Sequence, residues 1–192
     1  VTVGDRTVLS PEYNAVRHAN ALLIKDAYKK QDAKISSFSI DVNFNANRGW
    51  DYNSYILPYY VDASNMVKLQ WQTGTDSVTG GTVASIRIIK TVGGSSKNMQ
   101  GTKAINGLSL DEWVTIKFDY DYSGTNIKLS VEITDAEDNV LYTLAGSDTG
   151  LPSTTAGAFN IGIMSACETE NYITAGKTRT YTYYDNLAIT YS

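Results

Sequence analysis

The chain has 192 residues, of which 42% are apolar and 19% are charged, and its formal net charge is −4. Nucleic-acid binding needs a basic surface that neutralises phosphates, so we expect no nucleic acid among the partners. No run of 18 apolar residues is present, and we therefore expect no membrane insertion.

The residue types favour strands and turns over helices. The 14 tyrosines and the abundant Thr are typical of strands, while Asn, Gly and Ser supply turns. The length suits one large β-sandwich, so we predict a single all-β domain over residues 1–192, with an N-terminal strand or loop segment at 1–20. The first residues include neither an initiator Met nor an apolar leader, which indicates a processed or excised piece of a longer protein.

Five segments alternate apolar and polar residues, as expected for strands with one buried face. They lie at 38–44, 67–71, 114–122, 127–133 and 159–163. Weaker strands are predicted at 21–25, 54–61, 83–91, 140–144 and 178–191, and the segment 11–20 is predicted to be a loop or a single helical turn. Turn residues at 92–96, 122–125 and 135–139 separate neighbouring strands. About ten strands predict a two-sheet antiparallel β-sandwich.

The sequence lacks the residues that several kinds of catalytic site require. His18 and Cys167 are the only histidine and cysteine, so a zinc site built from these two residue types is excluded. A serine or cysteine hydrolase normally needs a histidine base beside its nucleophile. His18 lies in the unpatterned N-terminal segment, and we interpret it as a surface residue.

Glycoside hydrolysis instead needs two carboxyl groups that face each other. The acidic segment nearest to such an arrangement contains Glu132, Asp135 and Glu137. Glu132 and Asp135 are three residues apart and would point to opposite faces of a strand, so this segment reads as a polar strand face followed by an acidic hairpin loop. Glu168 and Glu170 could share a face but lie in a stretch with the composition of a loop. We therefore expect no enzyme.

Two loops carry residues suited to sugars, whose C–H faces stack on aromatic rings and whose hydroxyls bond to amides and carboxylates. The first loop lies between two predicted strands, at 48–55, and the second lies at 170–176. An alternative for the tryptophan of the first loop is a lid packed over the edge of the sandwich. The candidate ligand-binding residues are Trp50, Asp51, Tyr52, Asn53, Asn171 and Tyr172.

The other aromatic residues are assigned by their phase within the strands. Trp71 alternates in phase with Leu69 and is predicted to lie in the core. Trp113 is out of phase with Val114, which predicts a position on the polar face, with a structural role or, as the alternative, a binding role. Tyr183 belongs to a tyrosine cluster that we expect to pack within a strand.

Calcium prefers six to eight oxygen ligands. Asp185 shares its parity with Leu187 and would point toward the core, where a carboxylate requires a cation or hydrogen-bond donors. We take Asp185 as a candidate calcium ligand, with Asp26 and Asp5 as partners near the other chain end. The alternative is a hydrogen-bonded Asp at the rim of the sandwich.

The order of segments resembles that of a known family. The pair Glu112-Trp113 opens a long strand, and Asp185-Asn186 followed by Leu187 closes the last one. With the strand order over residues 20–192, this resembles the concanavalin A-like, laminin-G-like jelly rolls, and among them the bacterial carbohydrate-binding modules. The resemblance implies a jelly-roll sandwich, a structural calcium near the chain ends, and attachment to other domains of a secreted or cell-surface protein.

Together these observations predict non-catalytic binding of a polysaccharide or oligosaccharide. Starch, plant cell-wall glycans such as xylan, β-glucan and host glycans all remain open as ligands. Two alternatives remain open as well: a glycan-active hydrolase or lyase on the same fold, and an adhesin or structural spacer domain.

Overall fold

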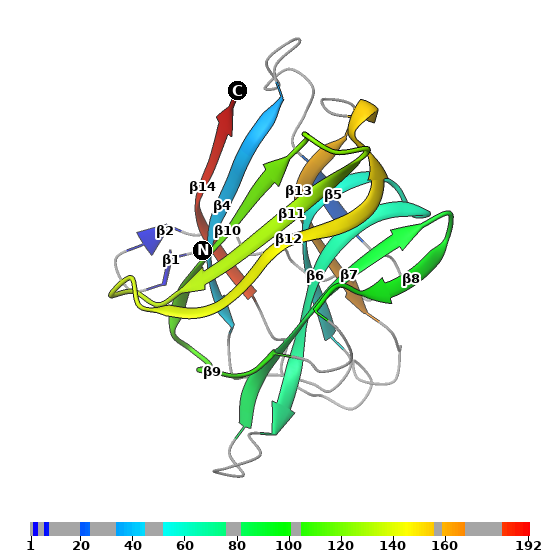
Figure 1. Ribbon diagram of the computed structural model, residues 1–192. Helices are drawn as coiled ribbons and strands as arrows, with labels where there is room; N and C mark the ends of the chain where they lie inside the picture. Colours follow the sequence, from blue (N-terminus) through cyan, green and yellow to red (C-terminus); the bar gives the residue numbers. More distant parts are fainter. Residues whose placement is uncertain are drawn as a thin grey trace.

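The computed structural model describes residues 2–3, 6–7, 20–23, 34–44, 52–75, 82–100, 105–155, 159–167 and 182–192. Within these ranges the strands form two large antiparallel sheets and one short pair, as Figure 1 shows. No helix in the same ranges is long and apolar enough to span a membrane.

The first large sheet has five strands in the order β12-β11-β10-β4-β14. Their bounds are β4 Ile35–Phe44, β10 Trp113–Asp121, β11 Asn126–Thr134, β12 Val140–Pro152 and β14 Thr182–Tyr191.

The second sheet has seven strands, in the order β3-β13-β5-β6-β7-β8, with β9 paired to β7. Their bounds are β3 Asn20–Leu23, β5 Tyr52–Asp62, β6 Asn65–Thr75, β7 Thr82–Val92, β8 Ser95–Asn98, β9 Ile105–Leu108 and β13 Asn160–Cys167. The short pair consists of β1 Thr2–Val3 and β2 Arg6–Thr7.

The predicted all-β sandwich is confirmed, and every segment with strong alternation is a strand. Of the weaker segments, 140–144 is much longer than predicted, because β12 continues to Pro152 through Gly146 and Gly150, whose φ angles are 46° and 73°. Glycine adopts such positive φ values without steric cost, so the strand bends there and continues. Of the segment 11–20, predicted to be a loop or a helical turn, residues 11–19 lie outside the described residues and Asn20 is the first residue of β3.

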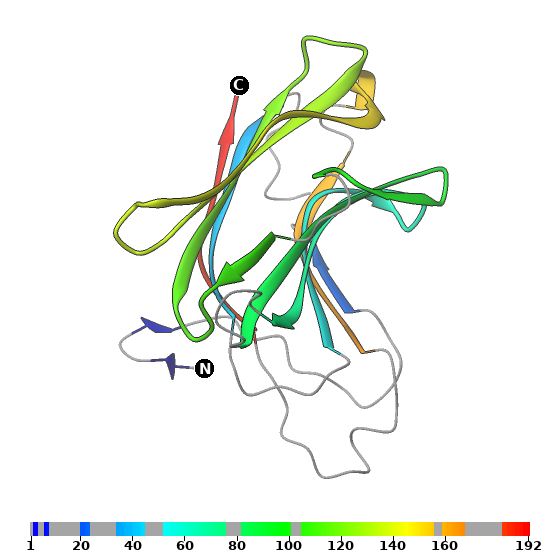
Figure 2. The ribbon, with the colours of Figure 1, turned by 60° about the horizontal axis from the view of Figure 1, so that its bottom comes forward.

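The two sheets pack face to face over one apolar core, and Figure 2 shows them as separate layers. In β10 the alternation is plain, because Val114, Ile116 and Phe118 are buried while Lys117 between them is exposed. Phe118 stacks on Phe38 of β4 with ring centroids 5.5 Å apart. The apolar half of each strand is thus used to hold the sheets together, and each sheet keeps an outer face.

Hydrogen bonds also join the sheets. The Nε1 of Trp71 in β6 donates to Oγ1 of Thr182 in β14 at 3.0 Å, inside the core. The Tyr120 hydroxyl of β10 donates to the backbone oxygen of Pro58 in β5 at 2.5 Å. Because buried polar groups are costly when unpaired, these bonds fix which residues of the two layers face each other.

The buried tyrosines predict a loss of stability at alkaline pH. Burial raises the pKa of the Tyr120 phenol well above its usual range, and the neighbouring Tyr122 and Asp119 raise it further. The folded state therefore keeps a proton that the unfolded chain releases above about pH 10, so stability is present below that pH and falls as the pH rises beyond it. The decline can reach about 1.4 kcal/mol per pH unit for one such group.

The variant Tyr120→Phe separates the two contributions of this hydroxyl. At pH 7 it should lose about 1–3 kcal/mol, because the carbonyl of Pro58 loses its donor. Urea unfolding at pH 7 and pH 11 should also show a smaller alkaline decline than in the parent chain. An equal decline in both proteins would mean that Tyr120 does not titrate in this way.

Candidate carbohydrate-binding faces

Most of the loop residues predicted to bind ligand lie outside the described residues, namely Trp50, Asp51, Asn171 and Tyr172. Tyr52 and Asn53 form the first residues of β5, where they pair with Cys167 and Ala166 at the end of β13. The chain therefore enters β5 and leaves β13 at paired positions. Because of this pairing, the strand ends next to the two predicted loop segments lie side by side.

A row of aromatic and amide side chains crosses the outer face of the five-stranded sheet. Trp113 in β10 pairs with Asn43 in β4, and Asn43 pairs on its other side with Tyr183 in β14. All three are out of phase with buried neighbours such as Val42 and Tyr184, so they belong to the outer face. Trp113 and Tyr183 are half-buried, and Asn43 between them is buried. We call these three residues the Trp113 row.

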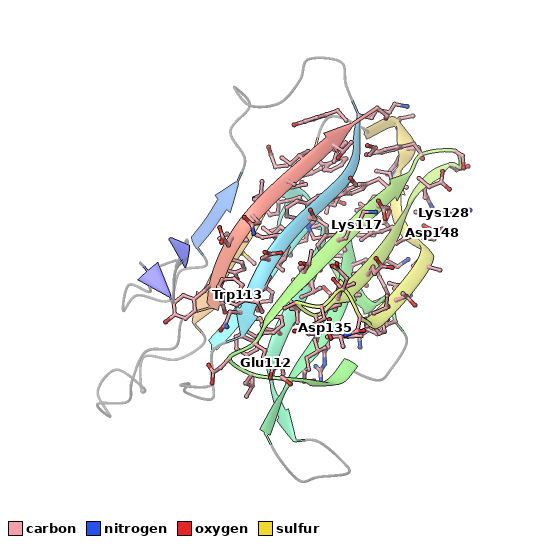
Figure 3. The ribbon with its side chains drawn as sticks, turned by 90° about the vertical axis from the view of Figure 1, so that its left-hand side faces the viewer. Glu112, Trp113, Lys117, Lys128, Asp135 and Asp148 are labelled. Carbon is pink, nitrogen blue, oxygen red and sulfur yellow. The ribbon has the colours of Figure 1, made fainter. Side chains whose placement is uncertain are left out.

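The strand start at Trp113 is held by a backbone contact. Asp111 has a φ of 64°, a left-handed conformation that Asp tolerates better than most residues. Its amide donates to the backbone oxygen of Phe44, at the end of β4, at 2.9 Å. Figure 3 looks onto this face and shows Trp113 at one end of it, beside β4 and β14.

Next to the Trp113 row lies a network of polar side chains. The Thr115 hydroxyl donates to Oδ1 of Asp41 at 2.7 Å, and Nδ2 of Asn186 donates to Oδ2 of the same carboxylate at 2.7 Å. Both oxygens of Asp41 thus accept a hydrogen bond from a neighbouring strand. Three strands contribute to this network, so its side chains are positioned rather than free to rotate.

The prediction that Asp185 points toward the core is wrong. Asp185 pairs with Asp41 on the outer face, and its neighbour Tyr184 is the buried residue. Leu187, whose parity was used for the assignment, is itself 46% exposed. The register of β14 shifts between Asp185 and Ala188, where Asn186 has a φ of 47°, so the alternation of the later residues does not carry back to Asp185. The carboxylate accepts the amide of Asn186 at 2.9 Å.

The predicted calcium ligands are Asp185, Asp26 and Asp5. Within the described ranges, no group of three or more His, Cys, Asp or Glu side chains could hold a metal ion. Asp41, the carboxylate opposite Asp185, already accepts two hydrogen bonds. Asp5 and Asp26 lie outside the described residues, so a calcium ion at these three aspartates stays a prediction.

The acidic segment after β11 is a hairpin loop, as its spacing indicates. Asp135 accepts the side-chain amide of Asn139 at 2.9 Å and the backbone amides of Asn139 and Glu137 at 2.8 and 3.0 Å. The bond from the Asn139 side chain is the largest cause lowering the pKa of Asp135, which keeps the carboxylate charged. Glu132 lies on the strand before it and is exposed. Asp135 thus orders the turn.

The outer face of the seven-stranded sheet has a different composition. Lys68 and Gln70 in β6 alternate with buried Val67 and Leu69 and so point outward. Gln70 pairs with Tyr55 in β5 on one side and with Arg87 in β7 on the other. The Lys68 Nζ lies 4.7 Å from the centroid of the Tyr55 ring, and Arg87 is exposed.

Comparison with known proteins supports the fold. No family model and no curated protein matches the chain. Among solved structures, an alginate lyase from Aplysia kurodai is 12% identical, with a TM-score of 0.50, over 85% of this chain and 72% of the lyase. Peanut lectin is 14% identical, with a TM-score of 0.47, over 98% of this chain and 90% of the lectin.

A β-1,3-glucanase from Mycobacterium marinum is 11% identical, with a TM-score of 0.45, over 82% of this chain and 63% of the enzyme. At these identities the likeness concerns the fold and not the activity. The two antiparallel sheets, packed on one core and matched by the alginate lyase at a TM-score of 0.50, give the chain the concanavalin A-like jelly-roll β-sandwich fold.

Proposed function

We propose that the chain binds polysaccharide without reacting with it, as an accessory domain of a secreted or cell-surface bacterial protein that degrades or captures glycans. The observation that carries the proposal is the Trp113 row beside the Asp41 network. Two half-buried aromatic residues lie on one sheet face with an amide between them and a positioned carboxylate in the next row. Stacking surfaces and polar groups are what a sugar chain needs.

The spacing within the row supports a linear ligand. Neighbouring strands lie about 4.8 Å apart, which places Trp113 and Tyr183, two strands apart, at roughly 9.6 Å. That span is comparable with the length of two linked sugar rings. A shallow sheet face removes little water from its ligand, so we expect affinities between micromolar and millimolar, about −4 to −8 kcal/mol.

Two further parts of the proposal concern residues beyond the described faces. The loop residues Trp50, Asp51, Asn171 and Tyr172, with Tyr52 and Asn53 at the start of β5, would extend the binding surface beside the paired strand ends. A structural calcium at Asp185, together with Asp26 and Asp5, would stabilise the sandwich. An alginate lyase that shares the fold supports a glycan as the class of ligand.

Affinity electrophoresis against soluble starch, xylan, β-glucan and mucin, with and without a chelator, tests the proposal. We expect retention by at least one polysaccharide. Trp113→Ala should weaken that binding about threefold to tenfold, as expected for the loss of one aromatic contact. The control Leu141→Ala, which removes an apolar side chain 44% exposed on the same sheet, should leave binding unchanged.

Three outcomes would contradict parts of the proposal. No retention by any polysaccharide would favour an adhesin or a structural spacer. Release of reducing sugars or of unsaturated products would favour a hydrolase or a lyase on this fold. Equal melting temperatures with and without the chelator would contradict the proposal of a structural calcium.

A further inference from the structure

The two sheets carry opposite charge. The five strands β4, β10, β11, β12 and β14 contain two basic and six acidic residues, whereas the strands of the seven-stranded sheet contain four basic residues and one acidic residue. The chain as a whole has a net charge of −4. Among the described strands, the basic residues are thus concentrated on the seven-stranded sheet, although the chain as a whole is acidic.

The single acidic residue of the seven-stranded sheet belongs to a turn. Oδ1 of Asp62 accepts the amide of Ser64 at 2.7 Å and the Nδ2 of Asn65 at 3.2 Å, closing the turn between β5 and β6. Of the basic residues, Lys90 donates to the backbone oxygen of Asp148 in β12 at 2.6 Å. Lys97 pairs with Lys90, which shares its parity with the buried Ile88, so the described cations that point outward from this sheet are Lys68 and Arg87.

These two cations lie beside groups that suit a sugar acid. Lys68 is positioned over the Tyr55 ring, which places its ammonium group in the same part of the face as the row Tyr55-Gln70-Arg87. An arginine fork binds a carboxylate or sulfate through two parallel hydrogen bonds, and an ammonium adds a point charge. The Gln70 amide between them can donate to or accept from a hydroxyl.

We propose that this outer face, defined by Lys68, Gln70 and Arg87, with the buried Tyr55 ring beneath Lys68, binds the anionic groups of an acidic polysaccharide. The shared chemistry is a repeated carboxylate or sulfate along a sugar chain. The acidic five-stranded sheet repels such a chain, while the basic face attracts it, so the charge of the two sheets selects the side on which the ligand docks. This inference rests on the proposed function and adds a second face, which takes a different class of ligand from the acidic face that carries the Trp113 row.

The test measures binding to alginate, which carries carboxylates, to dextran sulfate, and to neutral dextran at two salt concentrations. We expect stronger binding to one or both acidic polymers than to neutral dextran, and weaker binding at high salt because exposed charges are screened. Retention of alginate alone identifies carboxylates as the ligand groups, and retention of dextran sulfate alone identifies sulfates.

Two variants test the residues. Lys68→Met keeps an apolar stem over the Tyr55 ring, and Arg87→Gln keeps a polar side chain. Each should weaken binding of the acidic polymer about threefold, and the double variant about tenfold, as expected for exposed charges. The control Lys128→Gln removes one positive charge from an exposed position on β11 and should leave binding within about twofold.

The outcomes separate this inference from the function that it rests on. Retention of neutral polysaccharides without any preference for acidic ones would overturn the inference and leave the proposed function intact. Equal weakening by Lys128→Gln and by the two variants would mean that net charge and not this face attracts the polymer, and would also overturn it. No retention of any polysaccharide would overturn both.

Discussion

Replacing Trp71 by alanine is expected to lower the free energy of unfolding by about 3–5 kcal/mol, the usual cost of removing a large aromatic side chain from a core. Trp71 is only 6% exposed, and its ring lies 4.8 Å from that of Phe44 across the two sheets. Its Nε1 also donates to the buried hydroxyl of Thr182. The substitution leaves a cavity between the layers and removes this buried hydrogen bond.

Trp71→Phe separates packing from hydrogen bonding. It keeps an aromatic ring against Phe44 but removes the donor, so the expected loss is about 1–3 kcal/mol. Urea unfolding measures both values. Val61→Ala, at a side chain 41% exposed on the same sheet, serves as the control and should change stability by less than about 0.5 kcal/mol. A loss below 1 kcal/mol for Trp71→Ala would mean that the sheets repack around the vacancy.

The second large effect concerns ligand binding. Trp50→Ala is expected to weaken polysaccharide binding by about tenfold or more, with nearly unchanged melting temperature. The reason is the composition of its segment, in which an aromatic ring is flanked by a carboxylate and followed by Asn53 at the start of β5. An exposed tryptophan is costly for solubility unless a ligand covers it.

The same binding assay and a thermal melt decide between two roles of Trp50. A large drop in melting temperature with intact binding would identify Trp50 as a lid on the sandwich edge and leave Trp113 as the main aromatic contact. Comparing the loss of binding in Trp50→Ala with that in Trp113→Ala also shows whether the loop or the sheet face contributes more to the affinity. If the two variants weaken binding of the same polysaccharide independently, a double variant should show the product of their effects.

The amino-acid sequence by itself determined the strands with strong alternation, because the alternation of buried and exposed residues is a local property of the backbone; β8 and β9 were not predicted. The run from Val114 to Phe118 could be assigned without any partner strand, and the phase of Trp71 correctly placed it in the core. The hairpin turns around Gly124 and Asp135 could also be predicted locally, because the residues within each turn select its conformation.

Only the tertiary structure decided which side chains meet. Asn43, Trp113 and Tyr183 are far apart in the chain, and the register that aligns them depends on pairings that no local pattern encodes. The shift in β14 turned Asp185 outward because a single irregular residue, Asn186, breaks the alternation on which its prediction relied. The separation of charge between the two sheets also depends on the tertiary structure, since strands distant in the sequence become neighbours only when the sandwich forms.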